Sequence, residues 1–510
     1  MKKQRAIVIG AGFGGLSAAI RLRAMGHPVT ILEARDQPGG RAGVVHRQGH
    51  TFDTGPTVIT APHLFEELFT LGGRRLSDYV DMVPVDPFYR VSFPDGTHFD
   101  YVGNEERLIS EISRFNPDDI DGYRLLARHA QEIFDVGYRQ LADEPFDSLA
   151  DMLRVVPDMI RLQSYRSVYG LVAKYIDDER LRQVFSFQPL LVGGNPFNVS
   201  SIYMLIHHLE RKWGVHFARG GTTALVDALV DLIDDLGIEL RLNTPVQQLE
   251  VGDDGVQAVI TESGQRLPCR FAVSNADPSH TYRQLLGTQH LSWGTRFKIK
   301  RTRQSMGLFV GFFGTDTTYD DLPHHNIVLG PRYRGLLDDI FQHKVLADDF
   351  SLYLHRPTAT DPQLAPDGCD TFYVLSPVPN NHSDICWEDT GDAYMDRILA
   401  HLEQRHMPGL RDRITTRFWH CPDYFEDQLR SVVGAGFGPE PRLTQSAWFR
   451  FHNRSKDVDG LYFVGAGVHP GAGIPGVLNS SKVLEQLVPR PVGEQTARPP
   501  TPESASRETA

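Results

Sequence analysis

The chain has 510 residues, of which 41% are hydrophobic and 23% charged, and its net charge is −12. This length exceeds a single core and predicts about three domains. The acidic balance argues against nucleic acid as a partner, because phosphate binding needs a basic face. The four cysteines are scattered without a Cys-x-x-Cys pair. We therefore expect no metal site, no disulfide framework and a reducing cytoplasm.

Neither end of the chain indicates a targeting segment. Residues 1–5 are basic, but the apolar stretch that follows is too short for a signal peptide. No run of about 18 apolar residues predicts a membrane-spanning helix. The tail at 489–510 is rich in Pro, Thr, Glu, Ser and Arg and is expected to be disordered.

The first 33 residues predict a β-α-β unit. A β-branched run at 6–9 enters a glycine turn, an amphipathic helix is expected at 16–25, and a second strand at 29–32. A strand, glycine turn, helix and strand within about 30 residues are the unit that dinucleotides use.

The glycines of that turn have the dinucleotide spacing Gly-x-Gly-x-x-Gly. Gly10 permits the tight turn, Gly12 lets the backbone approach a pyrophosphate, and Gly15 lets the helix pack on the strand. The helix N-terminus offers free N–H groups and partial positive charge to phosphates. Glu33, at the end of the second strand, can accept hydrogen bonds from a ribose.

The middle of the chain alternates between strand and helix patterns. A hairpin is expected around the Pro-Asp-Gly turn at 94–96, and the pattern is mostly helical from 109 to 209. Further along, a helix is expected at 225–236, strands at 238–242, 246–251 and 256–261, and several β-rich runs at 306–378.

Two glycine-rich segments occur near the C-terminus. The run at 461–464 reads as a buried strand that enters Gly465-Ala466-Gly467, so it can hold the other end of the same cofactor. The segment at 434–438 imitates the first motif, but Pro439 replaces the third glycine and no helix pattern follows. We interpret it as a loop beside a substrate cavity and not as an NAD site.

The pattern predicts an α/β fold with a discontinuous Rossmann-like domain. Substrate-binding, β-rich material is inserted between its pieces, and a helical subdomain is added. We expect the dinucleotide domain at 1–75, 215–290 and 440–488, the substrate domain at 76–145 and 291–439, and the helical subdomain at 146–214.

Two further motifs carry a resemblance to known families. Gly-Gly-Arg at 39–41 is familiar from FAD-dependent oxidoreductases related to amine oxidases. Gly-Ala-Gly at 465–467, His-Pro-Gly at 469–471 and Gly-Ile-Pro-Gly at 473–476 closely resemble the bacterial phytoene desaturases of carotenoid biosynthesis. The motifs at 53–57, 191–197, 219–222, 274–277 and 444–449 resemble the lycopene-forming type, so the resemblance covers nearly the whole chain.

The resemblance implies FAD as the cofactor. Gly10, Gly12, Gly15, Glu33, Gly40 and Arg41 would hold its ADP half, and Val246 would meet the adenine through its backbone. Gly14 and Asn275 are further cofactor-binding candidates. Pro56 and Thr57 would line the flavin pocket, and Gly465, Gly467, Ile474 and Val477 would border the flavin and ribityl chain.

The implied substrate is phytoene, a forty-carbon hydrocarbon, with quinone or oxygen as the final electron acceptor. Desaturation of phytoene transfers a hydride to the flavin and releases a proton. Because the allylic cation left by hydride loss is strongly acidic, a weak base is enough. Asp151 and Arg154 match polar positions of the family and are the only catalytic candidates. The alternative is a surface ion pair that opens a helix. His469 is interpreted as structural.

A substrate of this kind implies contact with a lipid bilayer. At about 0.8 kcal/mol per CH₂, passage through water would cost on the order of 30 kcal/mol. The segment 152–174 carries Arg154, Arg161, Arg166 and Lys174 against only Asp158, interleaved with apolar residues. We expect it to face the inner leaflet of the cell membrane from the cytoplasm. The alternative is a core helix with snorkelling arginines.

Rival interpretations stay open at this point. Another carotenoid flavoenzyme is possible: a neurosporene-forming desaturase, a diapophytoene desaturase, a ketolase or an isomerase. A non-catalytic binding protein that resembles the GDP-dissociation inhibitors has the same architecture, but the intact Gly12, Glu33 and Arg41 argue against it. The number of desaturation steps and the oligomeric state are not predicted.

Overall fold

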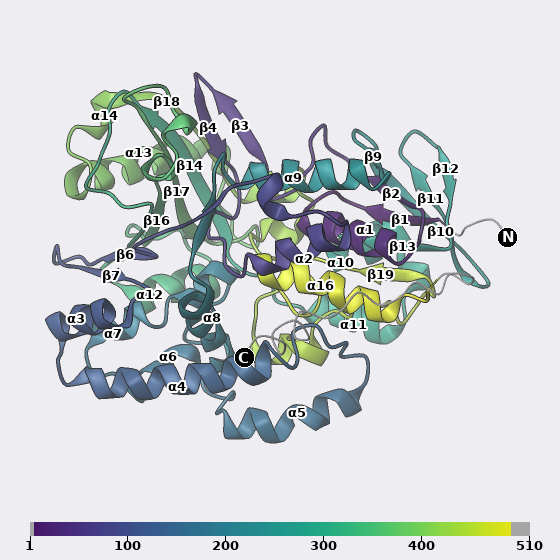
Figure 1. Ribbon diagram of the computed structural model, residues 1–510, viewed down its shortest axis with the longest axis horizontal. Helices are drawn as coiled ribbons and strands as arrows, with labels where there is room; N and C mark the ends of the chain where they lie inside the picture. Colours follow the sequence, from purple (N-terminus) through teal and green to yellow (C-terminus); the bar gives the residue numbers. More distant parts are fainter. Residues whose placement is uncertain (1–4, 491–510) are drawn as a thin grey trace.

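The structure is a computed structural model that describes residues 5–490, and two sheets organise it (Figure 1). The first is a five-stranded parallel sheet in the order β19-β13-β1-β2-β9, which confirms the predicted α/β fold. Its strands are β1 (Ala6–Ile9), β2 (Val29–Leu32), β9 (Glu239–Arg241), β13 (Phe271–Ser274) and β19 (Leu461–Phe463).

Helices and a small sheet cover the two faces of this parallel sheet. The nearly all-buried helix α1 (Phe13–Ala24) packs between α16 (Ile474–Leu487), α9 (Thr222–Asp235) and α2 (His63–Leu71). On the other face lies the three-stranded sheet of β10 (Val246–Gly252), β11 (Gly255–Thr261) and β12 (Arg266–Pro268).

Most predicted elements of this half are confirmed. The strands at 6–9 and 29–32 agree with β1 and β2, and the hairpin of β10 and β11 turns at 253–254. The first helix was expected at Leu16 but begins at Phe13, because Gly14 and Gly15 already take helical conformation. The expected tail lies, from residue 491 on, outside the described residues.

The second sheet has seven strands in the order β18-β14-β17-β16-β15-β6-β7. Its faces differ because side chains alternate along each strand. Phe309 and Phe313 pack against α13 (Trp387–Arg405), whereas Leu308 and Val310 point the other way, toward a cavity. The strands are β6 (Tyr89–Ser92), β7 (His98–Tyr101), β14 (Gly307–Thr315), β15 (His325–Val328), β16 (Leu352–His355), β17 (Asp370–Val378) and β18 (Ile414–His420).

The helical stretch predicted at 109–209 is confirmed and lies at the bottom of Figure 1. It comprises α3 (Glu105–Phe115), α4 (Asp119–Gly137), α5 (Leu149–Arg161), α6 (Val168–Val172), α7 (Glu179–Val184) and α8 (Leu205–Trp213). No helix within residues 5–490 is long and apolar enough to cross a bilayer.

Shorter elements complete the fold. They are β3 (Val44–Arg47), β4 (His50–Asp53), β5 (Met82–Pro84), β8 (His216–Ala218), α10 (Pro278–His280), α11 (Trp293–Arg301), α12 (Tyr333–Asp338), α14 (Leu410–Arg413) and α15 (Pro422–Asp427).

Candidate active site

The two glycine segments from opposite ends of the chain meet in the folded protein. Only β13 separates β1 from β19, so both strands deliver their glycines to the same edge of the sheet. A Cβ atom at Gly14 would lie 3.0 Å from the Cα of Gly465 and would overlap the side chain of Asn275. This contact confirms that the two segments form one site.

The N-terminus of α1 is open to an anion. Gly12 is the N-cap, no side chain caps the helix, and its first turn has no acidic residue. Gly10 has a φ of +94°, which favours glycine, and a Cβ atom at Gly15 would overlap the Gly10 carbonyl oxygen. Because Gly12 and Gly14 line a cavity, the free N–H groups of the helix can reach a bound phosphate.

Glu33 is buried beside the glycine turn. Its carboxylate accepts hydrogen bonds from the backbone N–H of Ala11 at 2.7 Å and of Arg35 at 3.0 Å. Glu33 therefore holds the turn in shape and also lines the cavity. Its contact with a ribose stays a prediction.

Arg41 brings a cation to the same place. Its Nη2 donates a hydrogen bond to the hydroxyl of Ser431, and its solvent-shielded Nε has no partner among residues 5–490. Burial lowers the pKa of Arg41, and the nearby carboxylate of Asp277 partly opposes that shift. A guanidinium with an unused, shielded donor fits the phosphates of a dinucleotide.

One continuous cavity of about 1230 Å³ begins at these residues. All of the predicted cofactor residues except Gly15 and Gly467 line this cavity. The lining ones are Gly10, Gly12, Gly14, Glu33, Gly40, Arg41, Pro56, Thr57, Val246, Asn275, Gly465, Ile474 and Val477. Gly15 lies behind the wall, in the packing role expected of it. Gly467 is not among the lining residues and packs against the ring of Pro278, where a side chain would not fit, so its contact with the cofactor stays a prediction.

The other half of the cavity is an apolar channel. Gly436 and Phe437, from the glycine-rich segment at 434–438, line this channel, which agrees with the interpretation of that segment as a cavity loop. Helix α5 contributes three inward side chains. The apolar lining includes Met152, Val155, Met159, Leu190, Leu191, Met306, Leu308, Val310, Ile327, Leu329 and Leu375.

The structure places Asp151 and Arg154 away from this cavity, and neither lines it. Asp151 accepts hydrogen bonds from the backbone N–H and the hydroxyl of Ser148 at 2.9 and 2.8 Å, so the two residues form a capping box at the start of α5. These hydrogen bonds lower the pKa of Asp151. The alternative, an ion pair of Asp151 with Arg154, is not formed between these two described side chains. The geometry gives neither residue contact with a reacting group.

The core-helix alternative for this segment is also wrong. Leu153 is 62% exposed and Ile160 63% exposed on the outer side of α5, whereas Met152 and Val155 are buried. His469 lines the cavity, and its buried Nδ1 has no partner within residues 5–490. Its Nε2 lies 3.3 Å from the Leu141 carbonyl oxygen and its ring packs edge-on against Phe146, which favours the structural interpretation, and that interpretation stays a prediction.

A carboxylic acid in the cavity wall was missed from the sequence. Glu210, on α8, is fully buried, and desolvation raises its pKa to about 8. Tyr89 donates a hydrogen bond to Glu210 Oε1 at 2.7 Å, and Oε2 has no partner within residues 5–490. The available signal was its place one turn after Ile206 on an apolar helix face.

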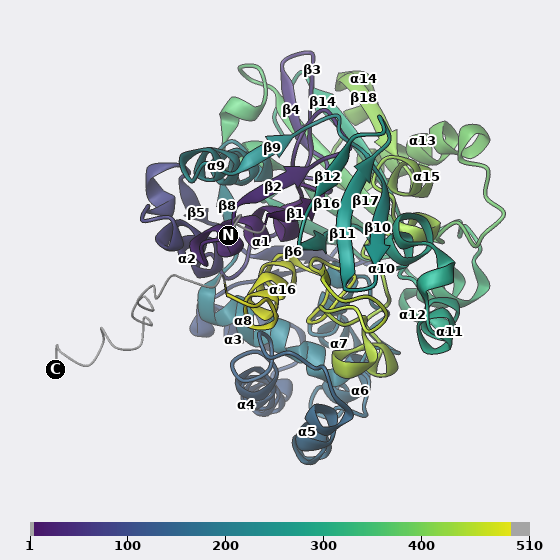
Figure 2. The ribbon, with the colours of Figure 1, turned by 90° about the vertical axis from the view of Figure 1, so that its right-hand side faces the viewer.

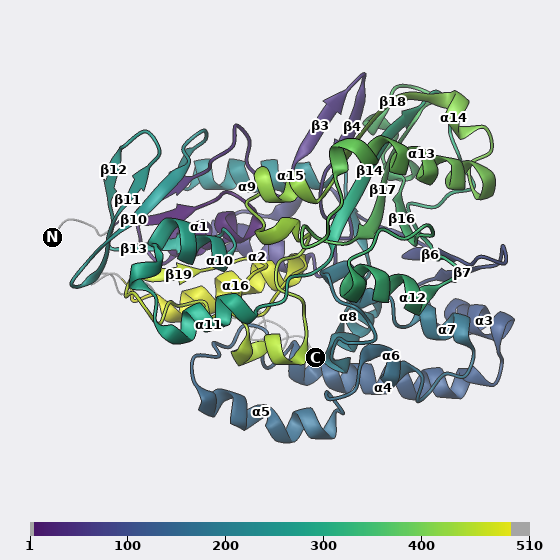
Figure 3. The same cartoon turned by 180° about the vertical axis from the view of Figure 1, so that it is seen from behind.

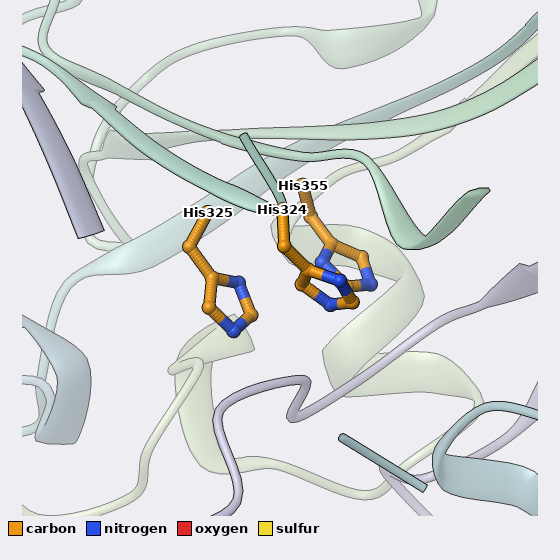
Figure 4. A group of neighbouring side chains, drawn as sticks. All are labelled: His324, His325 and His355. Atoms are coloured by element: carbon orange, nitrogen blue, oxygen red, sulfur yellow. The ribbon is translucent and has the colours of Figure 1, made fainter. Parts of the chain in front are cut away.

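Three buried histidines lie behind the wall, two of them directly opposite each other on β15 and β16 (Figure 4). Burial lowers the pKa of His324 to about 3 and those of His325 and His355 well below the usual value of a histidine. The rings of His325 and His355 stack at 20°, so their in-plane lone pairs do not converge on one ion, and we assign no metal here.

This histidine group is connected to the cavity. His325 Nδ1 lies 2.7 Å from the hydroxyl of Tyr353, which in turn lies 2.6 Å from Thr57 Oγ1. Thr57 and Tyr353 both line the cavity. The chain of hydrogen bonds therefore fixes the predicted flavin-pocket residue against the seven-stranded sheet.

Comparison with known proteins agrees with this geometry. Residues 13–482 match the model of the flavin containing amine oxidoreductase family. The chain is 52% identical to the lycopene-forming phytoene desaturase of Pantoea ananas, over 94% of this chain and 98% of that protein. It is 44% identical to the neurosporene-forming phytoene desaturase of Rhodobacter capsulatus, over 98% and 96%.

Solved structures agree on the fold. A putrescine oxidase bound to putrescine superposes with a TM-score of 0.63 at 15% identity, over 95% of this chain and 98% of that one. An oxidoreductase from Methanosarcina mazei gives 0.62 at 16% identity, over 94% and 100%. The uncapped N-terminus of α1, the shielded guanidinium of Arg41 and the close contact between Gly14 and Gly465, here called the glycine crossing, fit FAD. The chain belongs to the flavin-containing amine oxidoreductases and, among them, to the phytoene desaturases.

Proposed function

We propose that the protein is an FAD-dependent phytoene desaturase that converts phytoene to lycopene through phytofluene, ζ-carotene and neurosporene. The observation that carries the proposal is the single cavity, which is a dinucleotide site at one end and an apolar channel at the other. The lycopene-forming relatives, at 48–52% identity, support this product over neurosporene, whose formers are 44% identical.

Bound FAD supplies the acceptor for the hydride that leaves an allylic carbon of the substrate. The chain must hold that carbon about 3–3.5 Å from the acceptor. Pro56, Thr57 and Tyr353 line the cavity, as do Ile474 and Val477, and these are the residues expected to border the flavin. Since the substrate has no polar groups, the shape of the channel sets the register of the polyene.

The second half of each desaturation releases a proton. The allylic cation left by hydride loss is strongly acidic, so a weak base such as water is sufficient. Glu210 holds its own proton at neutral pH, because its pKa is raised to about 8, and therefore adds no charge to the channel. The apolar walls keep bulk water from the reacting carbon.

We further propose that the protein docks on the cytoplasmic face of the cell membrane through α5. The support is the two-sided character of this helix: Met152, Val155 and Met159 line the channel, while Leu153 and Ile160 are exposed on the other side. One helix thus separates the channel from the exterior. A polyene drawn directly from a bilayer avoids the cost of about 30 kcal/mol in water.

The desaturase proposal is tested with the purified protein, FAD and phytoene-containing liposomes, with products separated by chromatography. We expect lycopene as the end product. Parallel reactions with a quinone under argon and with oxygen identify the electron acceptor. A protein that binds FAD but gives no conjugated product with either acceptor would contradict the proposal.

Docking through α5 is tested by liposome flotation of the variant Arg154→Glu, Arg161→Glu, Arg166→Glu. We expect weaker binding to anionic vesicles. The matched control is Arg405→Glu, Arg411→Glu, Arg413→Glu, in and next to α14 at the top of Figure 1. Undiminished flotation of the α5 variant would rule this surface out.

A further inference from the structure

Helix α11 exposes a pair of aromatic side chains. Trp293 is 78% exposed and Phe297 46% exposed. They stand four residues apart on the helix and their rings stack, with centroids 5.2 Å apart at an angle of 19°. A tryptophan this exposed leaves a large apolar ring in water, which marks an interaction surface.

The surroundings of this pair are basic in an acidic chain. Residues 291–303 include Arg296, Lys300, Arg301 and Arg303, all exposed, and no acidic residue. Within residues 5–490, neither Lys300 nor Arg301 forms an ion pair, and the guanidinium of Arg301 stacks over Phe297 at 5.2 Å. Exposed aromatic rings close to exposed basic side chains are complementary to the headgroup region of anionic lipids.

The inner side of α11 is held firmly. Ile299 is buried, and Lys298 Nζ donates a hydrogen bond to the carbonyl oxygen of Arg450 at 2.6 Å while lying over the ring of Phe451. Burial lowers the pKa of Lys298 to about 8, so this lysine serves the contact and not the surface. The exposed pair therefore stands on a helix fixed to the segment around residue 450.

The same segment also supports α5. Ala447 and Trp448 pack with Met152 and Val155 on the inner side of α5, and the next residue, Phe449, is 40% exposed. In Figure 2, α5 and α11 lie along one lower right-hand edge, with the segment before residue 450 between them. Figure 3 agrees, with α11 above α5 at the lower left. The two helices therefore lie toward the same edge of the molecule.

We propose that α11 is a second attachment point for an anionic bilayer, with Trp293 and Phe297 inserted at the headgroup level and Lys300 and Arg301 on the lipid phosphates. Docking on α5 and α11 together would fix the tilt of the protein and hold the α5 side of the channel against the membrane. The inference rests on the proposed membrane docking of α5 and extends it to a second helix.

The test is flotation of FAD-loaded protein with vesicles of phosphatidylglycerol and phosphatidylcholine, against vesicles of phosphatidylcholine alone. We expect Trp293→Ser, Phe297→Ser to weaken binding to the anionic vesicles about tenfold or more. Leu125→Ser, an exposed leucine on α4, is the matched apolar control. Lys300→Ala, Arg301→Ala should weaken only the anionic binding, and Arg411→Ala, Arg413→Ala should not.

A second readout observes Trp293 directly. The difference in fluorescence between the parent protein and Trp293→Phe should shift to the blue on anionic vesicles and be quenched by brominated lipid. Equal flotation of parent and double variant would overturn the inference. So would a double variant that loses only self-association, because the pair would then contact a second copy. Neither result touches the desaturase proposal or the docking of α5, since product analysis tests the first and the α5 variant tests the second.

Discussion

The two ends of the cavity are built in opposite ways. At the dinucleotide end the fit depends on absent side chains, as where Gly14 meets Gly465. At the channel end the wall is made of side chains from the seven-stranded sheet and the helical layer, such as Val310 on β14 and Met152 on α5. At the first end, positions such as Gly14 and Gly15 have no room for a side chain, whereas the second end is a shape that can be adjusted.

The difference teaches where each property of the enzyme is encoded. Cofactor binding depends on a few positions that must stay small, and the loss of any one is severe. Product choice depends on many side chains that each contribute a little. Substitutions at the two ends should therefore separate cofactor content from product pattern. Of the four predictions below, the first and the third test that separation, and the other two test how the channel end is built.

The largest effect is expected at the glycine crossing. In Gly14→Ala the new methyl group would press on the backbone of Gly465 at 3.0 Å and on Asn275. We expect FAD affinity to fall by about 100-fold or more, measured as bound flavin per polypeptide. Gly294→Ala is the control, because its nearest neighbour is Ser292 Oγ at 3.9 Å. Normal flavin content in Gly14→Ala would break the comparison.

The next effect concerns a carboxylic acid in the wall of the channel end. The pKa of Glu210 is raised from 4.5 to about 8 in the folded protein, so the folded state holds a proton that the unfolded state releases. Stability must then fall as pH rises from about 5 to about 8. Glu210→Gln cannot ionise, so its free energy of unfolding should fall less between pH 5 and pH 9 than that of the parent. We expect the two decreases to differ by a few kcal/mol.

Urea unfolding across that pH range measures this difference. Asp53, whose pKa burial raises to about 6, contributes in part of the same window in both proteins, so it cancels in the comparison. Parallel stability curves for the parent and Glu210→Gln would show that this carboxyl is not buried as described.

A smaller effect is expected from filling the channel. Val310→Phe narrows the apolar half without touching the glycine crossing. We expect normal flavin content but about tenfold less lycopene, with less desaturated polyenes accumulating, because the polyene cannot advance as far. Val310→Ile adds one methyl group, and its lycopene yield should lie between those of the parent and Val310→Phe. An unchanged product pattern would mean that this strand does not set the register.

The smallest effect is expected at the start of α5. If Asp151 acts as half of a capping box, Ser148→Ala and Asp151→Ala should each loosen α5 by about 1 kcal/mol. Their effects on turnover should be equal, and the double variant should be no worse. Hydrogen exchange of the α5 amides measures the loosening. A loss of turnover confined to Asp151→Ala would restore the catalytic hypothesis.

Local patterns were sufficient for the dinucleotide end. Gly10, Gly12 and Gly15 follow a strand within a few residues, and their roles are set by backbone geometry that repeats wherever this turn forms. The pairing with Gly465 was also predicted, because a second buried strand that ends in a glycine turn can hold the other end of the same cofactor. Gly467 shows the limit: a glycine next to the site packs on Pro278 and not on the cavity.

Tertiary structure alone decided the rest. The sequence by itself determined the α/β fold and the dinucleotide turn, since these depend on short-range spacing, and its motifs carried the resemblance that implied FAD and the family. Whether Asp151 faces a reaction or a helix end, whether Glu210 is buried, and which faces of α5 and α11 remain uncovered depend on contacts between residues far apart in the chain. Such contacts arise only when the layers pack, because burial is a property of the assembled neighbours and not of the residue.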